Sequence, residues 1–554
     1  MRRTDRRNWA WLPGRLRFRV LGLIDAVALW VLVAVLTGAG AWWGVDTYQQ
    51  HRDYCTENQE LRRVDAGADA GEECIGVTAE AYPFAPDLDD VLGRIEDENK
   101  AARDSGRPVV SVAVVMPYTS RSPGAAMSKD LIRHSLQGAY LAQRDHNNGP
   151  VSGGPAIQLL FANVGEDLKQ WRIVTDALAA RTDDESPLVA AIGLPNSDNY
   201  TLESVKYGLG ADEIPAVSAA LSSGDMENRY LFKVSPSNDQ LVDALKRYAT
   251  DPANQVNREK TFMIADERED NYVANLSLVF RREFGAQYGI TDNEVGRLTE
   301  MYKGRKGPPD EGEPQIFGRA VSAMCVADTS TVFLAGRDAD LWPFLKAIDS
   351  QPACVRDPDE GPLRILRVST GRDPVTETAE MRAIADRSNI EIVTAAAVDA
   401  PRWLAARSGD EQVPKAFAPF ADSYDGSFDE ERPDALNDGY AVMYHDALTA
   451  VGTAVAAASS SGSDSVNRGD VYDELRRGSP GGHCPAGCVP GASGVFTFDD
   501  ASIGRDEGTR HEVATGLWPV CKPVPVVTFP KELRSKSPLY RTYEEEGENT
   551  CPPP

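Results

Sequence analysis

Apolar residues fill the stretch from Val109 to Met116, and the pattern then changes to one typical of a helix. The run stops at Pro117, which predicts a short buried strand. A polar loop follows, and over residues 129–146 apolar positions recur three and four apart. This spacing predicts a helix that ends at 147–149, Asn-Asn-Gly. A strand, a loop and a helix in this order predict an α/β fold with ligand chemistry in the loops.

The same unit recurs through most of the chain. Strands that alternate with helices favour parallel sheets with both faces covered. The pattern restarts near residue 230, so we expect two Rossmann-like lobes joined by crossovers, with the ligand site in the cleft between them. A long helix is expected over 438–458, and surface insertions over 303–314, 405–433 and 459–494. Further strands are expected at 157–161, 188–192, 214–218, 230–234, 260–265, 331–335, 363–368 and 390–398.

The amino-terminal segment predicts a membrane anchor. Residues 20–45 contain one ionisable side chain, Asp25, and otherwise suit the ~20 residues of a transmembrane helix. Residues 1–20 carry a charge of +6, which favours a cytoplasmic amino terminus and an extracytoplasmic main body at the cell membrane. A cleaved signal peptide is the alternative, since 39–41 is Ala-Gly-Ala. The apolar run, however, exceeds the roughly 7–15 residues of a signal core.

The main body is strongly acidic and contains the cysteines. The chain has a net charge of -26, so the part after the basic tail carries -32, which argues against nucleic-acid binding. Eight cysteines outside the cytoplasm predict disulfides. Sequence proximity suggests Cys55–Cys74 and Cys325–Cys354, with the last four pairing among themselves. A metal site at 483–488 is the alternative there, but a disulfide-closed loop suits the Gly, Pro and Ala around it better.

Several short motifs recur in a fixed order: VAVVMP at 112–117, GAYLA at 138–142, AAIG at 190–193, IPAVS at 214–218, YLFKVSPS at 230–237 and GVFTFD at 494–499. With these motifs, the chain from about 109 to 500 resembles the type I periplasmic binding protein family. Within it, the likeness is to the branched-chain amino-acid binding proteins of ABC transporters, in a membrane-anchored variant of actinobacterial type. The resemblance implies two lobes that close on a small ligand.

The resemblance also implies five ligand-binding residues. In that family, loop hydroxyls and backbone groups of the first lobe hold the ligand's carboxylate and ammonium groups. Neutral donors suit a zwitterion, because no unpaired protein charge is buried. The plainer interpretations are a helix cap for Ser197, a turn for Ser222 and a helix-wall residue for Tyr272. Matched by position, the implied residues are Tyr118, Ser197, Ala220, Ser222 and Tyr272.

The charged part of the implied site stays open. Asp338 and Asp373 are the candidates for the second-lobe acid that meets a ligand ammonium. Arg337 and Arg372 stand in corresponding loops and would favour an anionic ligand, unless they are ordinary exposed arginines. The implied division of the chain is a basic tail (1–19), a transmembrane helix (20–45), a stalk or cap (46–108), lobe 1 (109–235 and 401–490), lobe 2 (236–400 and 491–535) and a tail (536–554).

We therefore expect a membrane-anchored extracytoplasmic protein that captures a small, polar, amino-acid-like solute for an ABC-type transporter permease. The alternative is a cell-envelope sensor or interaction protein that uses the same fold as a protein-binding platform. An enzyme is not expected, since the chain lacks dinucleotide-binding, phosphate-loop and nucleophile-elbow motifs. The histidines lack metal-site spacing, and His134 and His146 are expected at the surface. No cofactor, metal or nucleic-acid partner is expected.

Overall fold

The computed structural model divides into two compact units, Met1–Val64 and Asp65–Pro554. Apart from Trp30, the predicted basic tail and transmembrane helix lie outside the described residues. Among the helices that are described, none has the length and apolar character needed to cross a membrane. Strand β1 (Leu61–Asp65) spans the point in the sequence where the first unit ends. The described residues are 30, 53–66, 71–122, 125–149, 154–226, 228–254, 256–290, 299–304, 314–354, 356–371, 378–406, 413–428, 434–461, 465–477, 488–499, 517–530, 539–542 and 551.

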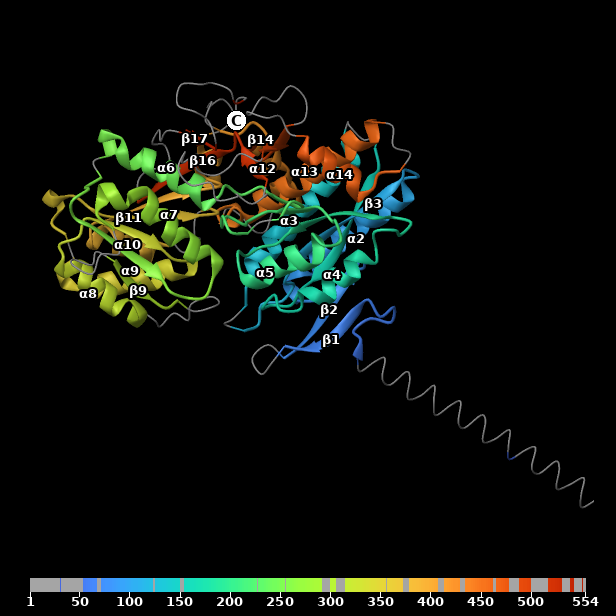
Figure 1. Ribbon diagram of the computed structural model, residues 1–554, viewed down its shortest axis with the longest axis horizontal. Coiled ribbons are helices and arrows are strands. Elements are labelled where there is room, and N and C mark those ends of the chain that lie inside the picture. The colour runs from blue at the N-terminus through green and yellow to red at the C-terminus, as the bar shows by residue number, and fades with distance from the viewer. Residues whose placement is uncertain are drawn as a thin grey trace, which may run out of the picture. The chain divides into compact units, whose positions relative to one another are not determined.

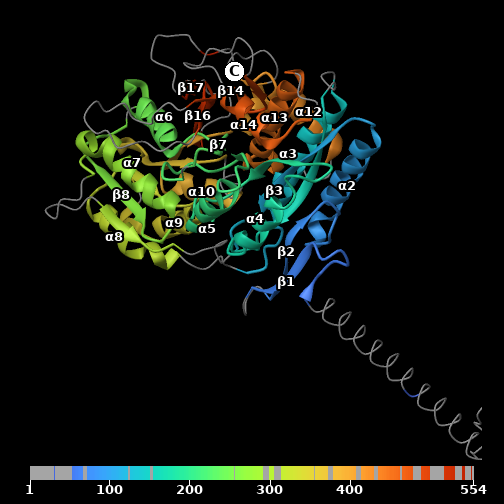
Figure 2. The same ribbon diagram turned by 45° about the vertical axis from the view of Figure 1, so that its right-hand side comes forward.

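The first sheet of the second unit runs in the order β2-β4-β3-β5-β6-β7. Its strands pair in parallel except for β2, which is antiparallel to β4. Helix α13 packs along α3, as Figures 1 and 2 show, and it also packs on β5 and β6. The strands are β2 (Glu72–Thr78), β3 (Val109–Met116), β4 (Ala156–Asn163), β5 (Leu188–Gly193), β6 (Ala216–Ser218) and β7 (Leu231–Lys233). The helices of this lobe are α2 (Asp89–Asp104), α3 (Lys129–Asn148), α4 (Trp171–Ala179), α5 (Asn199–Ser204), α11 (Ala400–Ala406), α12 (Phe417–Ser427), α13 (Tyr440–Ser460) and α14 (Arg468–Arg476).

Residues 71–104, part of the segment expected to be a stalk or cap, pack on this lobe. Strand β2 pairs with β4, and α2 packs on β4 and α3. Asn99 on α2 secures the packing, because its side chain accepts from the Leu159 N–H at 2.7 Å and donates to the Leu159 carbonyl at 2.9 Å. The segment is polar in composition, but Val91, Leu92 and Ile95 on α2 are buried.

The second sheet runs in the order β17-β16-β12-β11-β10-β8-β9. Strands β9, β8, β10, β11 and β12 are parallel, and β16 and β17 continue the sheet in antiparallel pairing. Its strands are β8 (Thr261–Asp266), β9 (Thr299–Tyr302), β10 (Thr331–Ala335), β11 (Leu363–Ser369), β12 (Ile390–Ala396), β16 (Pro523–Phe529) and β17 (Leu539–Arg541). Its helices are α6 (Asn238–Thr250), α7 (Asn271–Tyr288), α8 (Gly318–Val326), α9 (Leu341–Asp349) and α10 (Ala379–Arg387).

Within the described residues the chain passes between the lobes at three places. The first connection joins β7 to α6, and the second joins β12 to α11. The third joins β15 (Trp518–Val520) to β16, later in the chain than the boundary expected near residue 490. The shift arises because β14 (Gly494–Asp499) pairs with β13 (Val489–Gly491) and β15, and β13 packs on α13 of the first lobe.

The disulfides agree with the sequence-based expectation where the structure describes them. The Cys325–Cys354 pair is confirmed, and Cys521–Cys551 joins two of the last four cysteines. Cys55, Cys74 and Cys488 are each disulfide-bonded. The metal alternative at 483–488 lies outside the described residues except for Cys488, and within the described part of the chain no cluster of three potential metal ligands occurs.

Candidate functional site

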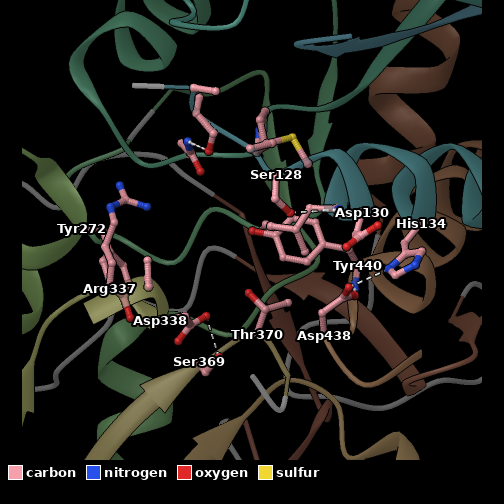
Figure 3. A pocket seen from close by; sticks show the side chains of 18 of the residues that line it. Ser128, Asp130, His134, Tyr272, Arg337, Asp338, Ser369, Thr370, Asp438 and Tyr440 are labelled. Atoms are coloured by element: carbon pink, nitrogen blue, oxygen red, sulfur yellow. Dashed lines mark hydrogen bonds and ion pairs between the residues drawn. The ribbon is translucent and has the colours of Figure 1, made fainter. Parts of the chain in front are cut away.

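A pocket of about 840 Å³ lies between the two lobes, where the carboxyl ends of their strands face each other. Figure 3 shows Tyr272, Arg337 and Asp338 of the second lobe on one side and His134 and Asp438 of the first lobe on the other. First-lobe segments that line it are 125–128, 130–131, 133–134, 195–197, 220, 222, 434–435, 438 and 440. Second-lobe residues that line it include Arg268, Tyr272, Arg337, Asp338, Trp342, Ser369, Thr370, Thr378 and Glu380.

The first-lobe wall presents Ser197, Ala220 and Ser222, which the resemblance implied as ligand contacts. Ser197 is not the cap of α5, because Asp198 occupies that position and its carboxylate accepts from the Thr201 N–H at 2.8 Å. The alternative interpretation of Ser197 as a helix cap is therefore excluded. This wall offers hydroxyl and backbone groups to a ligand.

Tyr272 lies at the start of α7 and lines the pocket from the second lobe. Its N–H donates to the Ser197 carbonyl at 3.1 Å, so the two lobes touch here, and its hydroxyl donates to the Val368 carbonyl at 3.3 Å. Burial raises the pKa of Tyr272 to about 12, which keeps the phenol neutral at physiological pH. Tyr272 thus combines an aromatic surface with a fixed position beside Ser197.

The Arg337 guanidinium lies over the Tyr272 ring, 5.3 Å from its centroid. Its Nε donates to Asp270 at 2.7 Å, and a second nitrogen contacts the same carboxylate. Burial opposes the charge of Arg337, but Asp270 outweighs it and raises the pKa of Arg337. Arg337 therefore enters the pocket as a neutralised pair rather than as an exposed arginine.

Asp338, one candidate for the ammonium-binding acid, is paired within its own lobe. Arg367 contacts its carboxylate, and the Ser369 hydroxyl donates to it at 2.9 Å. The other two charged candidates, Arg372 and Asp373, lie outside the described residues. Arg337 and Asp338, the two charged candidates that are described, are therefore already compensated by protein partners.

Tyr118 is the one implied ligand contact that does not line the pocket. It is fully buried, and its hydroxyl donates to the Val114 carbonyl at 2.9 Å. Its ring packs against Phe84 and Phe161, with centroids 4.8 and 6.0 Å away. Tyr118 is therefore a buried core residue in the loop after β3.

Sequence analysis missed His134, which is 6 % exposed and lines the pocket, so the prediction of a surface residue is wrong. Its Nδ1 lies 2.6 Å from the Asp438 carboxylate. His146 is half-buried, and its Nε2 lies 3.1 Å from the Pro155 carbonyl. Both lie on α3, which is covered on several sides by the sheet, α12 and α13. A pattern that assumes one buried helix face cannot identify such residues.

The His134–Asp438 pair predicts a pH-dependent stability. Burial and Arg133 lower the pKa of His134, but Asp438, with a smaller contribution from Asp130, raises it above its ordinary value. The pair therefore stabilises the fold fully below about pH 6.5, and this contribution is lost as the pH rises through the raised pKa. We expect the stability difference between the wild type and His134→Gln, measured by urea unfolding, to be larger at pH 6 than at pH 9.

His146→Gln is the matched control for this prediction. Burial lowers the pKa of His146, so the unfolded chain binds the proton more tightly than the folded one. The stability of the wild type relative to His146→Gln should therefore increase as the pH rises towards 7. Parallel pH profiles for the two variants would contradict the assignment of an ion pair to His134.

No protein-family model and no curated protein sequence matches the chain. Among solved structures, it is similar to an ABC-transporter solute-binding protein from R. palustris in complex with 4-hydroxybenzoate. The identity is 13 %, the match covers 79 % of this chain and 96 % of that chain, and the TM-score is 0.51. A leucine-binding protein from Thermotoga maritima shows 16 % identity over 76 % of this chain and 95 % of that chain, with a TM-score of 0.49. The chain has the two-lobed fold of type I periplasmic binding proteins.

Proposed function

We propose that this protein is a membrane-anchored, extracytoplasmic solute-binding protein for an ABC-type transporter. It captures a small, polar, amino-acid-like solute between its two lobes. The observation that supports this proposal is the pocket of about 840 Å³ with walls from both lobes. That volume lies in the range of about 300–1,000 Å³ that is usual for small-molecule sites.

The chemistry of the walls suits a zwitterion. Ser197 and Ser222 offer hydroxyls, and the serine and alanine loops offer backbone donors and acceptors. The charges of Arg337 and His134 are balanced by protein carboxylates, so a ligand without net charge leaves no buried charge unpaired. A protein-binding platform would be favoured by a cleft filled with bulky side chains, whereas this cleft is hollow.

A thermal-shift screen of the purified full-length chain in detergent tests the proposal. The panel contains amino acids, short peptides, sugars and organic anions, including aromatic acids because the R. palustris protein was solved with 4-hydroxybenzoate. A solute at 100 times its Kd that binds only the folded state stabilises it by about 2.7 kcal/mol. We expect an amino-acid-like hit, and a panel without any hit would favour the platform function.

Two substitutions test whether a solute found in the screen binds in this pocket. Ser222→Trp fills the first-lobe wall, and Tyr272→Ala removes the aromatic surface of the second lobe. Each is expected to lower the affinity by at least about tenfold, equivalent to about 1.4 kcal/mol. Leu278→Ala on the outward side of α7, 63 % exposed, is the control and should bind as the wild type does. An unchanged affinity in both pocket variants would exclude this pocket as the binding site.

A further inference from the structure

The third connection between the lobes is held to the carboxyl-terminal segment. Cys521 forms a disulfide with Cys551, and its N–H donates to the Thr542 carbonyl at 3.0 Å. The next residue, Lys522, donates its N–H to the Thr542 hydroxyl at 2.9 Å and accepts from the Thr542 N–H at 2.9 Å. One disulfide bond and three hydrogen bonds therefore hold Cys521 and Lys522 to the carboxyl-terminal segment.

The side chain of Lys522 fixes the same connection to the first lobe. Its ammonium lies 3.6 Å from the Asp446 carboxylate on α13, and both side chains are 0 % exposed. Asp446 also accepts from the N–H groups of Ala492 at 2.5 Å and Ser493 at 3.1 Å, in the turn between β13 and β14. A buried, hydrogen-bonded ion pair has a strict geometry, because either charge left alone would be costly.

The elements on either side of the first connection contact the strand that precedes the third. The Lys233 N–H donates to the Leu517 carbonyl at 3.0 Å, and the Lys233 ammonium lies 3.7 Å from the centroid of the Trp518 ring. Further along, the Gln240 side-chain amide donates to the Pro519 carbonyl at 3.3 Å. The elements that flank the first connection, β7 and α6, are therefore both tied to β15, which leads into the third.

None of Asp446, Cys521, Lys522 and Cys551 lines the pocket, so any effect on solute binding has to act through the placement of the lobes. Closure of two lobes concentrates the backbone rotation in a few residues of the connections. We propose that Lys522 and Asp446, with the Cys521–Cys551 disulfide, are positioning residues that make the third connection a fixed pivot for closure. The use of this pivot in solute capture rests on the proposed function, whereas its rigidity does not.

The two described disulfides allow a matched test. Cys521–Cys551 closes a loop of 30 residues at the pivot, and Cys325–Cys354 closes one of 29 residues within the second lobe. Because chain entropy depends on loop length, removing either one should lower the melting temperature by a similar amount. Of these two disulfide variants, only Cys521→Ala/Cys551→Ala is expected to change how the lobes move.

The readout is the distance distribution between spin labels on the two lobes, in the full-length chain without solute. Labels are attached at Tyr207→Cys in the first lobe and Leu278→Cys in the second, which are 58 % and 63 % exposed. The distribution should broaden in Cys521→Ala/Cys551→Ala and in Lys522→Met, and stay unchanged in Cys325→Ala/Cys354→Ala. Equal widths in the wild type and the pivot variants, or equal broadening in both disulfide variants, would overturn the proposal.

A second readout separates this proposal from the proposed function. For a solute found in the panel, the pivot variants should bind about fivefold or more weakly, although no pocket residue has changed. If no solute binds the wild type, the proposed function fails while the spin-label distances still test the pivot. If solute binds and the pivot variants bind it as tightly as the wild type, the positioning role is wrong.

Discussion

Replacing Asp446 by alanine is expected to lower the free energy of unfolding by about 3–5 kcal/mol, the usual cost of breaking a buried ion pair. Burial lowers the pKa of Lys522 to about 8 even with Asp446 beside it, and removing the carboxylate lowers this pKa further. The variant must therefore either bury an unpaired ammonium or release its proton, and each costs free energy. It also removes the acceptor for the N–H groups of Ala492 and Ser493. Unsatisfied buried donors add to the loss.

Urea unfolding at pH 7 measures this effect, and Asp90→Ala is the control. Asp90 is 70 % exposed and pairs with Arg94 one helical turn away, at 2.8 Å. A surface pair of this kind contributes at most about 1 kcal/mol. If both variants lost a similar free energy of unfolding, the buried Asp446–Lys522 pair would contribute no more to stability than a surface pair, and the prediction would be wrong.

Replacing Gly138 by alanine is expected to destabilise the first lobe by about 1–3 kcal/mol through overpacking. A Cβ at this position would lie 1.9 Å from the Ala441 carbonyl oxygen, so α3 and α13 would have to move apart. Both helices reach the pocket, α3 with His134 and α13 with Tyr440. The same substitution should therefore also weaken solute binding.

The control is Gly93→Ala on α2, where a Cβ would meet nothing within 4 Å. Alanine is favoured over glycine inside a helix by about 1 kcal/mol, so this variant should be more stable than the wild type. The same chemical change thus has opposite expected signs at the two sites, and thermal unfolding measures both. Stabilisation by both substitutions would contradict the close packing of α3 on α13.

The order of strands and helices could be predicted because strands buried on both faces are continuous apolar runs. The strand expected at 331–335 is β10, Thr331–Ala335, and the one expected at 188–192 is β5, Leu188–Gly193. Strand β2 has no such pattern. Its Glu73 is buried because the Thr119 hydroxyl and the Glu166 N–H bind the carboxylate, and both partners are distant in the sequence.

In the site, too, the residues that a local sequence pattern determines could be predicted, and those that depend on partners distant in the sequence could not. Ser197, Ala220, Ser222 and Tyr272 line the pocket because the carboxyl ends of parallel strands meet there. Tyr118 also follows a strand, but Phe84, from the segment expected to be a stalk, packs on its ring and forms part of the core around it. His134 could not be identified locally, since its partner Asp438 lies 304 residues away in the sequence.

In the proposed function, one solute is held by both lobes at once. Hydrogen exchange of the full-length chain, with and without the solute that stabilises it most, measures this directly. Exchange should slow both in the first-lobe loop at 220–223 and at the start of α7 around Tyr272, because each forms a wall of the same pocket. Protection confined to one lobe, or absent from both segments while the solute still stabilises the chain, would contradict capture between the lobes.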